Sequence, residues 1–198
     1  MTHIRTFAPG DEPALAEICL RTAASGGDAT GVLEDDDIWG NLFVLPYVTH
    51  APEFAFVVEA DDGRLVGYVV AAPDTDVFEQ WFHDLWWPKF SDRWPEPTTD
   101  LTPQDGLLTY AYSRRAGTNG YAKEYPAHLH ICLLPEMQRA GWGRRLIETE
   151  QDRLRQAGVR GLHLVPLSDN LGALEFYRRV GYTALPSEPG LQAFGVKL

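Results

Sequence analysis

The chain has 198 residues, 44% hydrophobic and 12% aromatic, which is enough to bury a large core and predicts a single domain over residues 1–198. Its 28 acidic and 17 basic residues give a net charge of -11, which argues against nucleic acid because phosphate binding depends on Lys and Arg. No stretch has the roughly 18 apolar residues of a membrane span, and the start MTHIRTFAPGDEP lacks the pattern of a signal peptide. We expect a cytoplasmic protein that binds neither nucleic acid nor membranes.

The two cysteines and the six histidines give no sign of a metal site. Cys19 and Cys132 each lie in an apolar segment, so we expect buried free thiols rather than a disulfide. No group of residues has the spacing of zinc ligands. We therefore expect no metal.

The first third of the chain predicts a strand, two helices and a hairpin. HIRTF is a short strand, and Asp11 is placed to cap a helix that runs to about Ala24. A second helix is expected over roughly 34–48. Two β-rich runs then flank Asp62-Gly63, which is a strong hairpin signal.

Residues 73–105 form a Trp- and Pro-rich insertion that holds four of the six tryptophans. One interpretation is an amphipathic helix over about 74–87 that covers a face of the sheet. The other is an exposed aromatic surface that contacts the substrate or a second copy of the chain in a homodimer, because exposed Trp is unusual without a partner.

The remaining segments alternate between strand and helix. We expect strands over 107–113, 127–134, 161–167 and 191–198, a helix over 141–157, and a helix that is capped at 168–170 and ends at Gly181. A turn is expected at Asn119-Gly120. This alternation indicates an α/β (α+β) protein with a mixed sheet.

The stretch LLPEMQRAGWGRRLIE, residues 133–148, predicts a loop that leaves a buried strand and enters a helix. The free N–H groups of a helix start form an anion site, and Gly141 and Gly143 lack the Cβ atoms that hold a phosphate away from the backbone. The alternative is an ordinary helix start. Neither a P-loop nor a dinucleotide fingerprint is present.

The order of motifs is more specific than this loop alone. An apolar strand, the pattern Gln138-Arg139-x-Gly141-x-Gly143, a helix, a strand and then DNLGALEFYRRVGY resemble the GNAT superfamily of N-acetyltransferases over roughly 107–185. The resemblance implies the GNAT fold, a central, mixed, mostly antiparallel sheet that splays at a V-shaped cofactor cleft and carries helices on both faces. It also implies acetyl-CoA (coenzyme A) as the cofactor.

The same resemblance implies roles for residues on the two motifs. Backbone N–H near Leu133 would polarise the thioester carbonyl, and the loop from Gln138 to Arg144 would hold the pyrophosphate. Tyr177 would protonate the departing thiolate; the alternative is a half-buried core aromatic. The implied cofactor-binding residues are Leu133, Leu134, Gln138, Arg139, Ala140, Gly141, Trp142, Gly143, Arg144, Asn170, Ala173, Phe176 and Tyr177. Asn170 is also placed to cap its helix.

The general base is less well defined. Several relatives have a glutamate where this chain has Ala127. His128 and His130 lie next to it and share one face of the strand, so either is a candidate base, or both are structural histidines packed on a helix. Glu124 and Tyr125 are further candidates.

A narrower similarity is to the acetyltransferase-like C-terminal domain of eukaryotic O-GlcNAcase, through the Trp-rich segment and YPAHLHICLLPEMQ. The leading prediction is an N-acetyltransferase that acts on a small-molecule or peptide amine by direct attack, and the acidic surface suits such an acceptor. One alternative is a pseudo-enzyme that binds acetyl-CoA as a sensor. A third is a protein-binding scaffold without a ligand.

Overall fold

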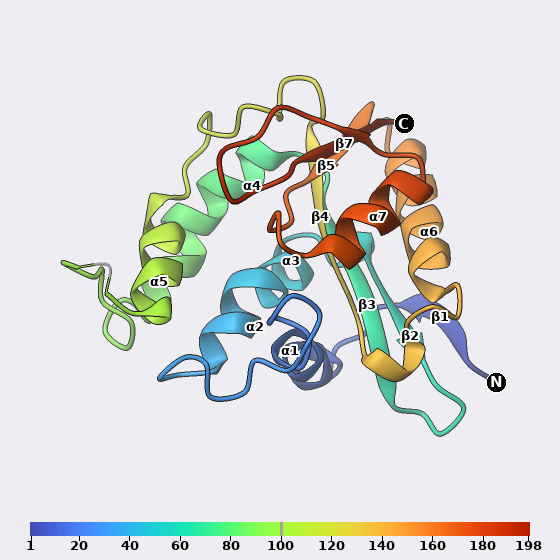
Figure 1. Cartoon of the computed structure of the whole chain (residues 1–198), viewed down its shortest axis with the longest axis horizontal. Coiled ribbons are helices and arrows are strands. Elements are labelled where there is room, and N and C mark those ends of the chain that lie inside the picture. Colours follow the sequence, from blue (N-terminus) through green and yellow to red (C-terminus); the bar gives the residue numbers. More distant parts are fainter. Residues whose placement is uncertain (100) are drawn as a thin grey trace.

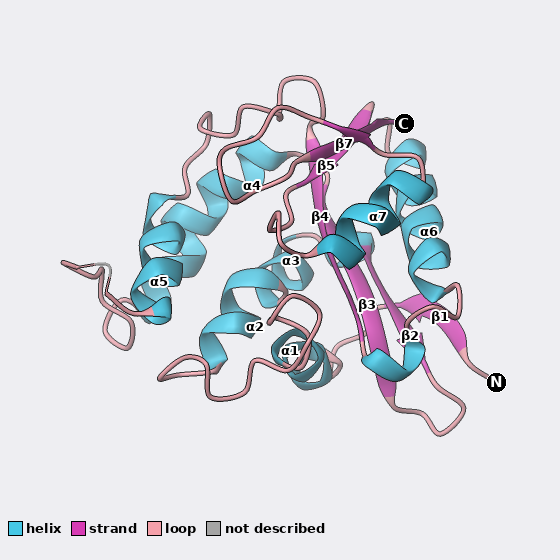
Figure 2. Ribbon diagram, viewed as in Figure 1, coloured by secondary structure: helices cyan, strands magenta, loops and turns pink. Residues whose placement is uncertain are grey.

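A seven-stranded sheet with helices on both faces forms the centre of the computed structural model, which describes residues 1–99 and 101–198 (Figures 1 and 2). The strand order is β1-β2-β3-β4-β5-β7-β6, and all neighbours are antiparallel except β4 and β5, which run parallel. The strands are β1 (His3–Thr6), β2 (Ala55–Glu59), β3 (Leu65–Ala72), β4 (Ala127–Leu133), β5 (Gly161–Leu164), β6 (Thr183–Ala184) and β7 (Phe194–Lys197). The expected mixed, mostly antiparallel sheet is confirmed.

The helices are divided between the two faces of the sheet: α1 to α5 lie on one side and α6 and α7 on the other (Figure 1). They are α1 (Glu12–Leu20), α2 (Asp37–Phe43), α3 (Leu45–His50), α4 (Thr75–Trp81), α5 (Pro103–Ser113), α6 (Trp142–Gln156) and α7 (Leu171–Arg179). Short helical turns are η1 (Pro52–Phe54), η2 (Phe82–Trp86), η3 (Trp87–Phe90) and η4 (Pro135–Met137).

Two hydrophobic cores follow from this division, because successive strand residues point to opposite faces. On β3, Tyr68 and Val70 enter the core under α1 to α5, and Val69 and Ala71 enter the core under α6 and α7. The sheet therefore separates the two helical layers. Any site that both layers share must lie where the sheet opens.

The sheet opens between β4 and β5. These strands pair only at Ala127 with Leu162 and His128 with His163. On its other edge β4 stays paired with β3 as far as Leu133. The part of β4 beyond His128 thus has one unpaired edge, which matches the cleft that the sequence predicts.

The predicted strand over 107–113 is wrong, because these residues belong to α5. Thr102 and Asp105 form a capping box, with Pro103 in the first turn, and this local chemistry starts a helix. Leu108 and Ala111, three residues apart, are buried against the helical layer. The segment also contains aromatic residues, which favour strands, but here the tertiary packing keeps it helical.

Two predicted helices are shorter or interrupted. The segment 34–48 is split at Val44, whose φ of -134° is not helical, and Pro46 lies in the first turn of α3. Asp11 precedes α1 without capping it, since its carboxylate binds the Arg5 guanidinium and the Ala8 N–H instead. The predicted hairpin is confirmed: Gly63 has a φ of +83° between β2 and β3.

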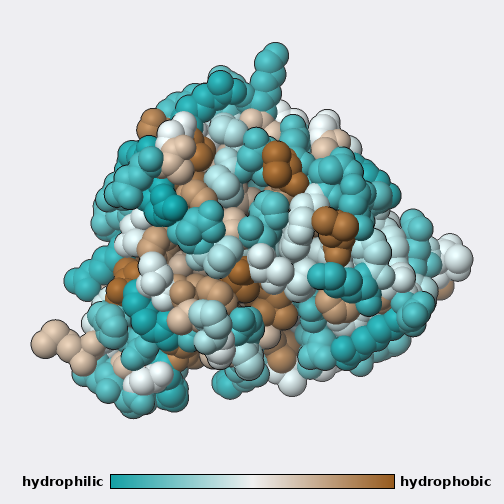
Figure 3. Space-filling model, turned by 180° about the vertical axis from the view of Figure 1, so that it is seen from behind, coloured by the Kyte–Doolittle hydropathy of each residue, from teal (hydrophilic) through white to brown (hydrophobic). Residues whose placement is uncertain are grey.

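The tryptophans of the segment 73–105 lie mostly inside the molecule. Trp86, Trp87 and Trp94 are at most 8% exposed and belong to the core below α1 to α5. Trp87 stacks on Phe82 and Trp94 on Phe90, and Trp86 contacts Phe90 edge-on. This confirms the packing interpretation and excludes an exposed tryptophan surface at these three positions. Seen from behind, the surface is mostly hydrophilic and hydrophobic residues show in separate spots (Figure 3). In the described part of the chain, no helix combines the length and apolarity needed to span a membrane.

Candidate active site

The unpaired edge of β4 presents the backbone of Leu133. The Leu134 N–H donates to the Val66 oxygen at 3.0 Å, so that N–H faces β3. Because strand N–H groups alternate in direction, the Leu133 N–H faces the open edge. The Leu133 oxygen on the same edge accepts from the Gln138 side chain at 3.0 Å. Of the two predicted backbone positions, Leu133 alone offers an N–H to the cleft.

The start of α6 has the geometry of an anion site. Gly141 has a φ of +86°, a conformation that glycine adopts without strain, and Arg139 has a φ of +61°. The first helical hydrogen bond joins the Arg145 N–H to the Gly141 oxygen. Within the described residues, the N–H groups of Trp142, Gly143 and Arg144 therefore have no backbone partner and lie at the positive end of the helix dipole.

Gly143 is a point of close contact between three elements. A Cβ atom on it would lie 3.2 Å from the Phe176 ring of α7 and 3.4 Å from the Leu133 side chain of β4. Gly67 on β3 faces Leu133 in the same way, and a Cβ atom there would overlap the Leu133 side chain. Glycine at both positions lets β4, α6 and α7 meet at the open end of the sheet.

The charged residues of the loop lie at its rim. Arg139 and Ala140 are exposed, and Arg144 donates to the Arg179 oxygen at the end of α7, at 3.2 Å. The Arg145 guanidinium lies over the Trp142 ring, 4.8 Å from its centre. The predicted loop residues thus lie around the start of α6. Among the described residues, the side chains of Arg144 and Arg145 contact other protein groups and that of Arg139 does not.

Helix α7 lies against the start of α6, through the contact of Phe176 with Gly143. Asn170 caps it by accepting from the Ala173 N–H at 3.0 Å, as predicted. Tyr177 is 7% exposed, and its ring packs on Tyr182 and Phe194. Burial raises the pKa of Tyr177, with smaller contributions from Tyr182 and from Cys132 on β4. The hydroxyl is therefore protonated at neutral pH.

His128 and His130 point to the side of the sheet that carries α1 to α5, as their shared face predicts. The ring of His130 stacks on Phe43 at 5.6 Å, and its Nδ1 is 3.0 Å from the Tyr68 hydroxyl. The ring of His128 makes edge contacts with the rings of Tyr47 and Phe78, which stack on each other. Burial lowers the pKa of His130 to about 4 and that of His128 well below its usual value. Both are neutral near pH 7.

Ala127 is fully buried on the other side of the sheet, in the core under α6 and α7. The position aligned with the relatives' glutamate therefore faces away from His128 and His130. Glu124 also lies away from Leu133: it pairs at 3.5 Å with Lys197, the last residue of β7. Tyr125 packs against Gly161 and Gly195. Neither of these two candidates is brought next to Leu133.

The sequence did not single out Tyr68 and Thr75, which hold the two histidines. Thr75 Oγ1 is 2.9 Å from His128 Nδ1, across 53 residues of sequence. Thr75 follows Asp74, whose carboxylate caps α4. The only local signal at this position is the start of a helix, so its contact with β4 is visible only in the tertiary structure.

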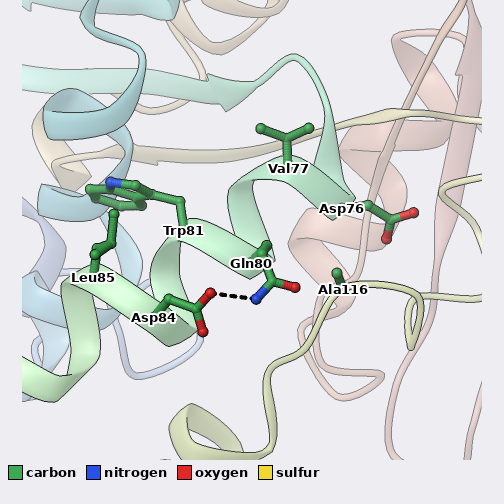
Figure 4. Close-up of a pocket in the computed structure, with 7 residues that line it drawn as sticks. All are labelled: Asp76, Val77, Gln80, Trp81, Asp84, Leu85 and Ala116. Carbon is green, nitrogen blue, oxygen red and sulfur yellow. Dashed lines mark hydrogen bonds between the residues drawn. The ribbon is translucent and has the colours of Figure 1, made fainter.

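A hollow of about 560 Å³ lies elsewhere, on the outer side of α4 and η2 (Figure 4). Val77, Trp81 and Leu85 form its apolar part, and the Gln80 amide donates to the Asp84 carboxylate beside them. None of the predicted site residues lines it. In the residues described, no three His, Cys, Asp or Glu side chains are grouped to hold a metal ion.

Comparison with known proteins agrees with this geometry. The pattern of the Acetyltransferase (GNAT) family matches residues 78–182. The chain belongs to this family. It is 34% identical to a protein named SsHAT, with 99% of this chain and 98% of that chain covered and a TM-score of 0.94.

Two more distant GNAT structures show the same fold. A polyamine N-acetyltransferase of Drosophila melanogaster, which forms N-acetylagmatine, is 17% identical with both chains fully covered (100%) and a TM-score of 0.64. A putative acetyltransferase of Salmonella typhimurium with bound acetyl-CoA is 15% identical, with 100% of this GNAT chain and 94% of that chain covered and a TM-score of 0.58.

Proposed function

We propose that this GNAT protein is an acetyl-CoA-dependent N-acetyltransferase that transfers an acetyl group to a primary amine by direct attack. The observation that carries the proposal is the unpaired edge of β4 at Leu133, next to the free N–H groups at the start of α6. The Drosophila relative acts on an amine, which supports an amine acceptor here. We propose a small-molecule amine or a lysine-containing peptide.

The residues present fit coenzyme A. An added Cβ atom at Gly141 would meet nothing within 4 Å, so this residue leaves space beside the α6 N–H groups, which suits a pyrophosphate, and Arg139 and Arg144 supply positive charge at the rim. Asn170 would bind the cofactor arm. The remaining residues proposed to line the arm are Leu133, Leu134, Gln138, Ala140, Trp142, Ala173 and Phe176. Bound acetyl-CoA would supply the thioester whose acetyl group is transferred.

Three residues have proposed chemical roles. The Leu133 N–H donates a hydrogen bond that stabilises negative charge on the acyl oxygen. The Tyr177 hydroxyl holds a proton at neutral pH and is suited to give it to the leaving sulfur. A neutral histidine, His128 or His130, accepts the proton that the amine loses.

The alternative of an acetyl-CoA sensor without catalysis is less well supported. It relied on the absence of a glutamate at Ala127 and on the similarity to the O-GlcNAcase domain, and Ala127 faces the core under α6. The acceptor side of β4 carries two neutral histidines instead. We propose further that residues 1–198 act as one cytoplasmic acetyltransferase domain with 73–105 as an insertion. We also propose a homodimer, which sedimentation at several protein concentrations would test. The similarity to the O-GlcNAcase domain stays a prediction.

The deciding experiment is calorimetric titration with acetyl-CoA of the unmodified protein, Gly141→Glu and Gly63→Glu. The two glycines have almost the same φ, +86° and +83°, and neither has an atom within 4 Å of an added Cβ, so the two variants carry similar backbone strain. We expect Gly141→Glu alone to lose binding. Free thiol is then assayed with agmatine and with a lysine peptide. Binding without thiol release from any amine would indicate a sensor, and no binding would overturn the proposal.

A further inference from the structure

The two candidate bases differ in how their Nδ1 atoms are held. His128 lies at the last pair between β4 and β5, where the sheet begins to open, and its partner in that pair is His163. His130 lies two residues further along β4, beyond the last pair with β5. Among the described residues neither Nε2 makes a hydrogen bond, and neither is a fully buried, unpartnered nitrogen. Which nitrogen of each ring carries the hydrogen is therefore determined by the hydrogen bond at Nδ1.

Thr75 determines where the proton of His128 lies. The Thr75 hydroxyl has one proton, and its oxygen is 2.7 Å from the Pro126 carbonyl oxygen, which can only accept. The proton must therefore lie between these two oxygens, because two lone pairs at this distance repel each other. The same hydroxyl oxygen is 2.9 Å from His128 Nδ1 and must accept there. Nδ1 of His128 then carries the hydrogen, and Nε2 carries the lone pair.

Tyr68 holds His130 in the opposite way. The phenol is fully buried, and burial raises its pKa, so it keeps its proton. The phenol is the stronger donor of the pair and imidazole the stronger acceptor, so the Tyr68 hydroxyl donates to His130 Nδ1 over 3.0 Å. Nε2 of His130 then carries a hydrogen. This nitrogen is a donor that cannot accept the proton of an amine.

His163 is excluded by its contacts. Its Nδ1 is 2.7 Å from the Tyr125 carbonyl oxygen, and its Nε2 is 3.0 Å from the Asn119 amide nitrogen. The ring donates through Nδ1 and accepts through Nε2, which leaves neither nitrogen for a reacting group. The centres of the His163 and His128 rings are 5.8 Å apart.

We propose that Thr75 is a positioning residue that fixes His128 as the Nδ1–H tautomer, so that Nε2 of His128 is the base of the acetyl transfer. The inference rests on the proposed function and chooses between the two histidines. In the proton transfer, the amine N–H bond breaks as a bond forms between the proton and Nε2. Nδ1 keeps its own hydrogen bond to Thr75, and the imidazolium later returns the Nε2 proton to water. Thr75 belongs to α4, so the Trp-rich segment contributes to the site.

The test is nitrogen NMR of protein labelled with ¹⁵N-histidine, at neutral pH, with the signals of His128 assigned by their loss in His128→Gln. We expect His128 to show a protonated Nδ1 and a bare Nε2, and His130 the reverse. Thr75→Val removes only the hydroxyl, so His128 should shift toward the Nε2–H tautomer. Thr75→Ser should restore the original pattern. Thr49→Val, an exposed threonine on α3 with a hydroxyl bonded to Leu45, is the matched control.

Activity gives the second measurement. We expect Thr75→Val to lower kcat at least about tenfold, with little change in the KM for acetyl-CoA, and Thr75→Ser to rescue it. An Nε2–H tautomer of His128 in the unmodified protein, or a tautomer unchanged in Thr75→Val, would overturn the positioning role. If Thr75→Val shifts the His128 tautomer as expected but leaves kcat unchanged, His128 is not the base, and the proposed function still stands. If the unmodified protein transfers no acetyl group, the proposed function and the base role fail together, and the NMR result still decides whether Thr75 fixes the tautomer.

Discussion

Gly143 on α6 lies against the ring of Phe176 on α7, so that a Cβ atom there would lie 3.2 Å from two ring carbons. This contact joins the start of α6 to the helix that carries Tyr177. Phe176 in turn packs on Tyr177, with ring centres 5.2 Å apart. The position of α7 beside the cleft therefore depends on the absence of a side chain at Gly143.

Gly143→Val should destabilise the fold through this contact. The added atoms must displace Phe176 and Leu133, at a cost of about 1–3 kcal/mol in the free energy of unfolding. Gly172→Val on α7 is the matched control, because it makes the same change in a helix and the nearest atom to an added Cβ, Asn170 Oδ1, is 3.9 Å away. Urea unfolding measures the difference. If the two substitutions lower the free energy of unfolding equally, the side chain added at Gly143 does not clash with Phe176 and Leu133.

Tyr177→Phe should lower kcat by about 100-fold at neutral pH, because it removes a proton donor and leaves the ring packing intact. Its ring contacts with Tyr182 and Phe194 predict an unchanged fold. Free thiol release gives kcat, and calorimetry gives the acetyl-CoA affinity, which should stay within a few-fold. A kcat that is unaffected would assign the proton on the leaving sulfur to another donor.

Asn170→Asp separates the two roles of Asn170. A carboxylate still accepts from the Ala173 N–H and so keeps the helix cap, but it has no amide donor for the cofactor arm. We expect thermal stability close to that of the unmodified protein and acetyl-CoA binding weaker by about tenfold. Asn170→Ala should lose about 1 kcal/mol of stability as well. Unchanged binding in Asn170→Asp would leave Asn170 with the capping role alone.

Glu150 on α6 predicts an unusual dependence of stability on pH. Its carboxylate is fully buried, and neither oxygen has a partner among the described residues. Burial raises its pKa from 4.5 to about 9. The folded state therefore keeps a proton that the unfolded state loses, so this group stabilises the fold below pH 4.5 and its contribution falls as pH rises toward 9, by up to about 1.4 kcal/mol per pH unit.

Glu150→Gln removes this ionisation. We expect its advantage in unfolding free energy over the unmodified protein to be larger at pH 8 than at pH 5, by urea unfolding at both values. Glu148→Gln, an exposed glutamate on the same helix, should show a much smaller difference. The same advantage of Glu150→Gln at both pH values would mean that the carboxyl is not the source of the dependence.

Glu79→Gln should strongly lower the free energy of unfolding, because Glu79 and Arg114 form a buried ion pair with two hydrogen bonds of 2.8 Å. Removing one partner leaves an uncompensated buried charge, at a cost of about 3–5 kcal/mol. The exposed pair of Arg21 and Glu17 is the control, and Glu17→Gln should change stability by less than about 1 kcal/mol. Similar losses in the two variants would show that water reaches the Arg114 pair.

Short-range chemistry in the sequence was enough to predict the loop that starts α6 at Gly141. Gly141 takes the left-handed conformation that glycine favours, and Asn170 caps α7 as its position before an apolar helix predicts. The hairpin at Gly63 follows from two turn residues. These features are determined within a few residues of the chain, so a single sequence contains the information.

Long-range packing decided the rest. The capping box at Thr102 and the burial of Leu108 make α5 a helix, although its aromatic run also suits a strand. Thr75 reaches His128 across 53 residues because β3 and β4 are neighbours in the sheet and α4 starts at their shared end. The alternation of β4 determined that His128 and His130 share a face, but which groups hold their nitrogens depends on contacts between distant segments, and only the tertiary structure brings those together.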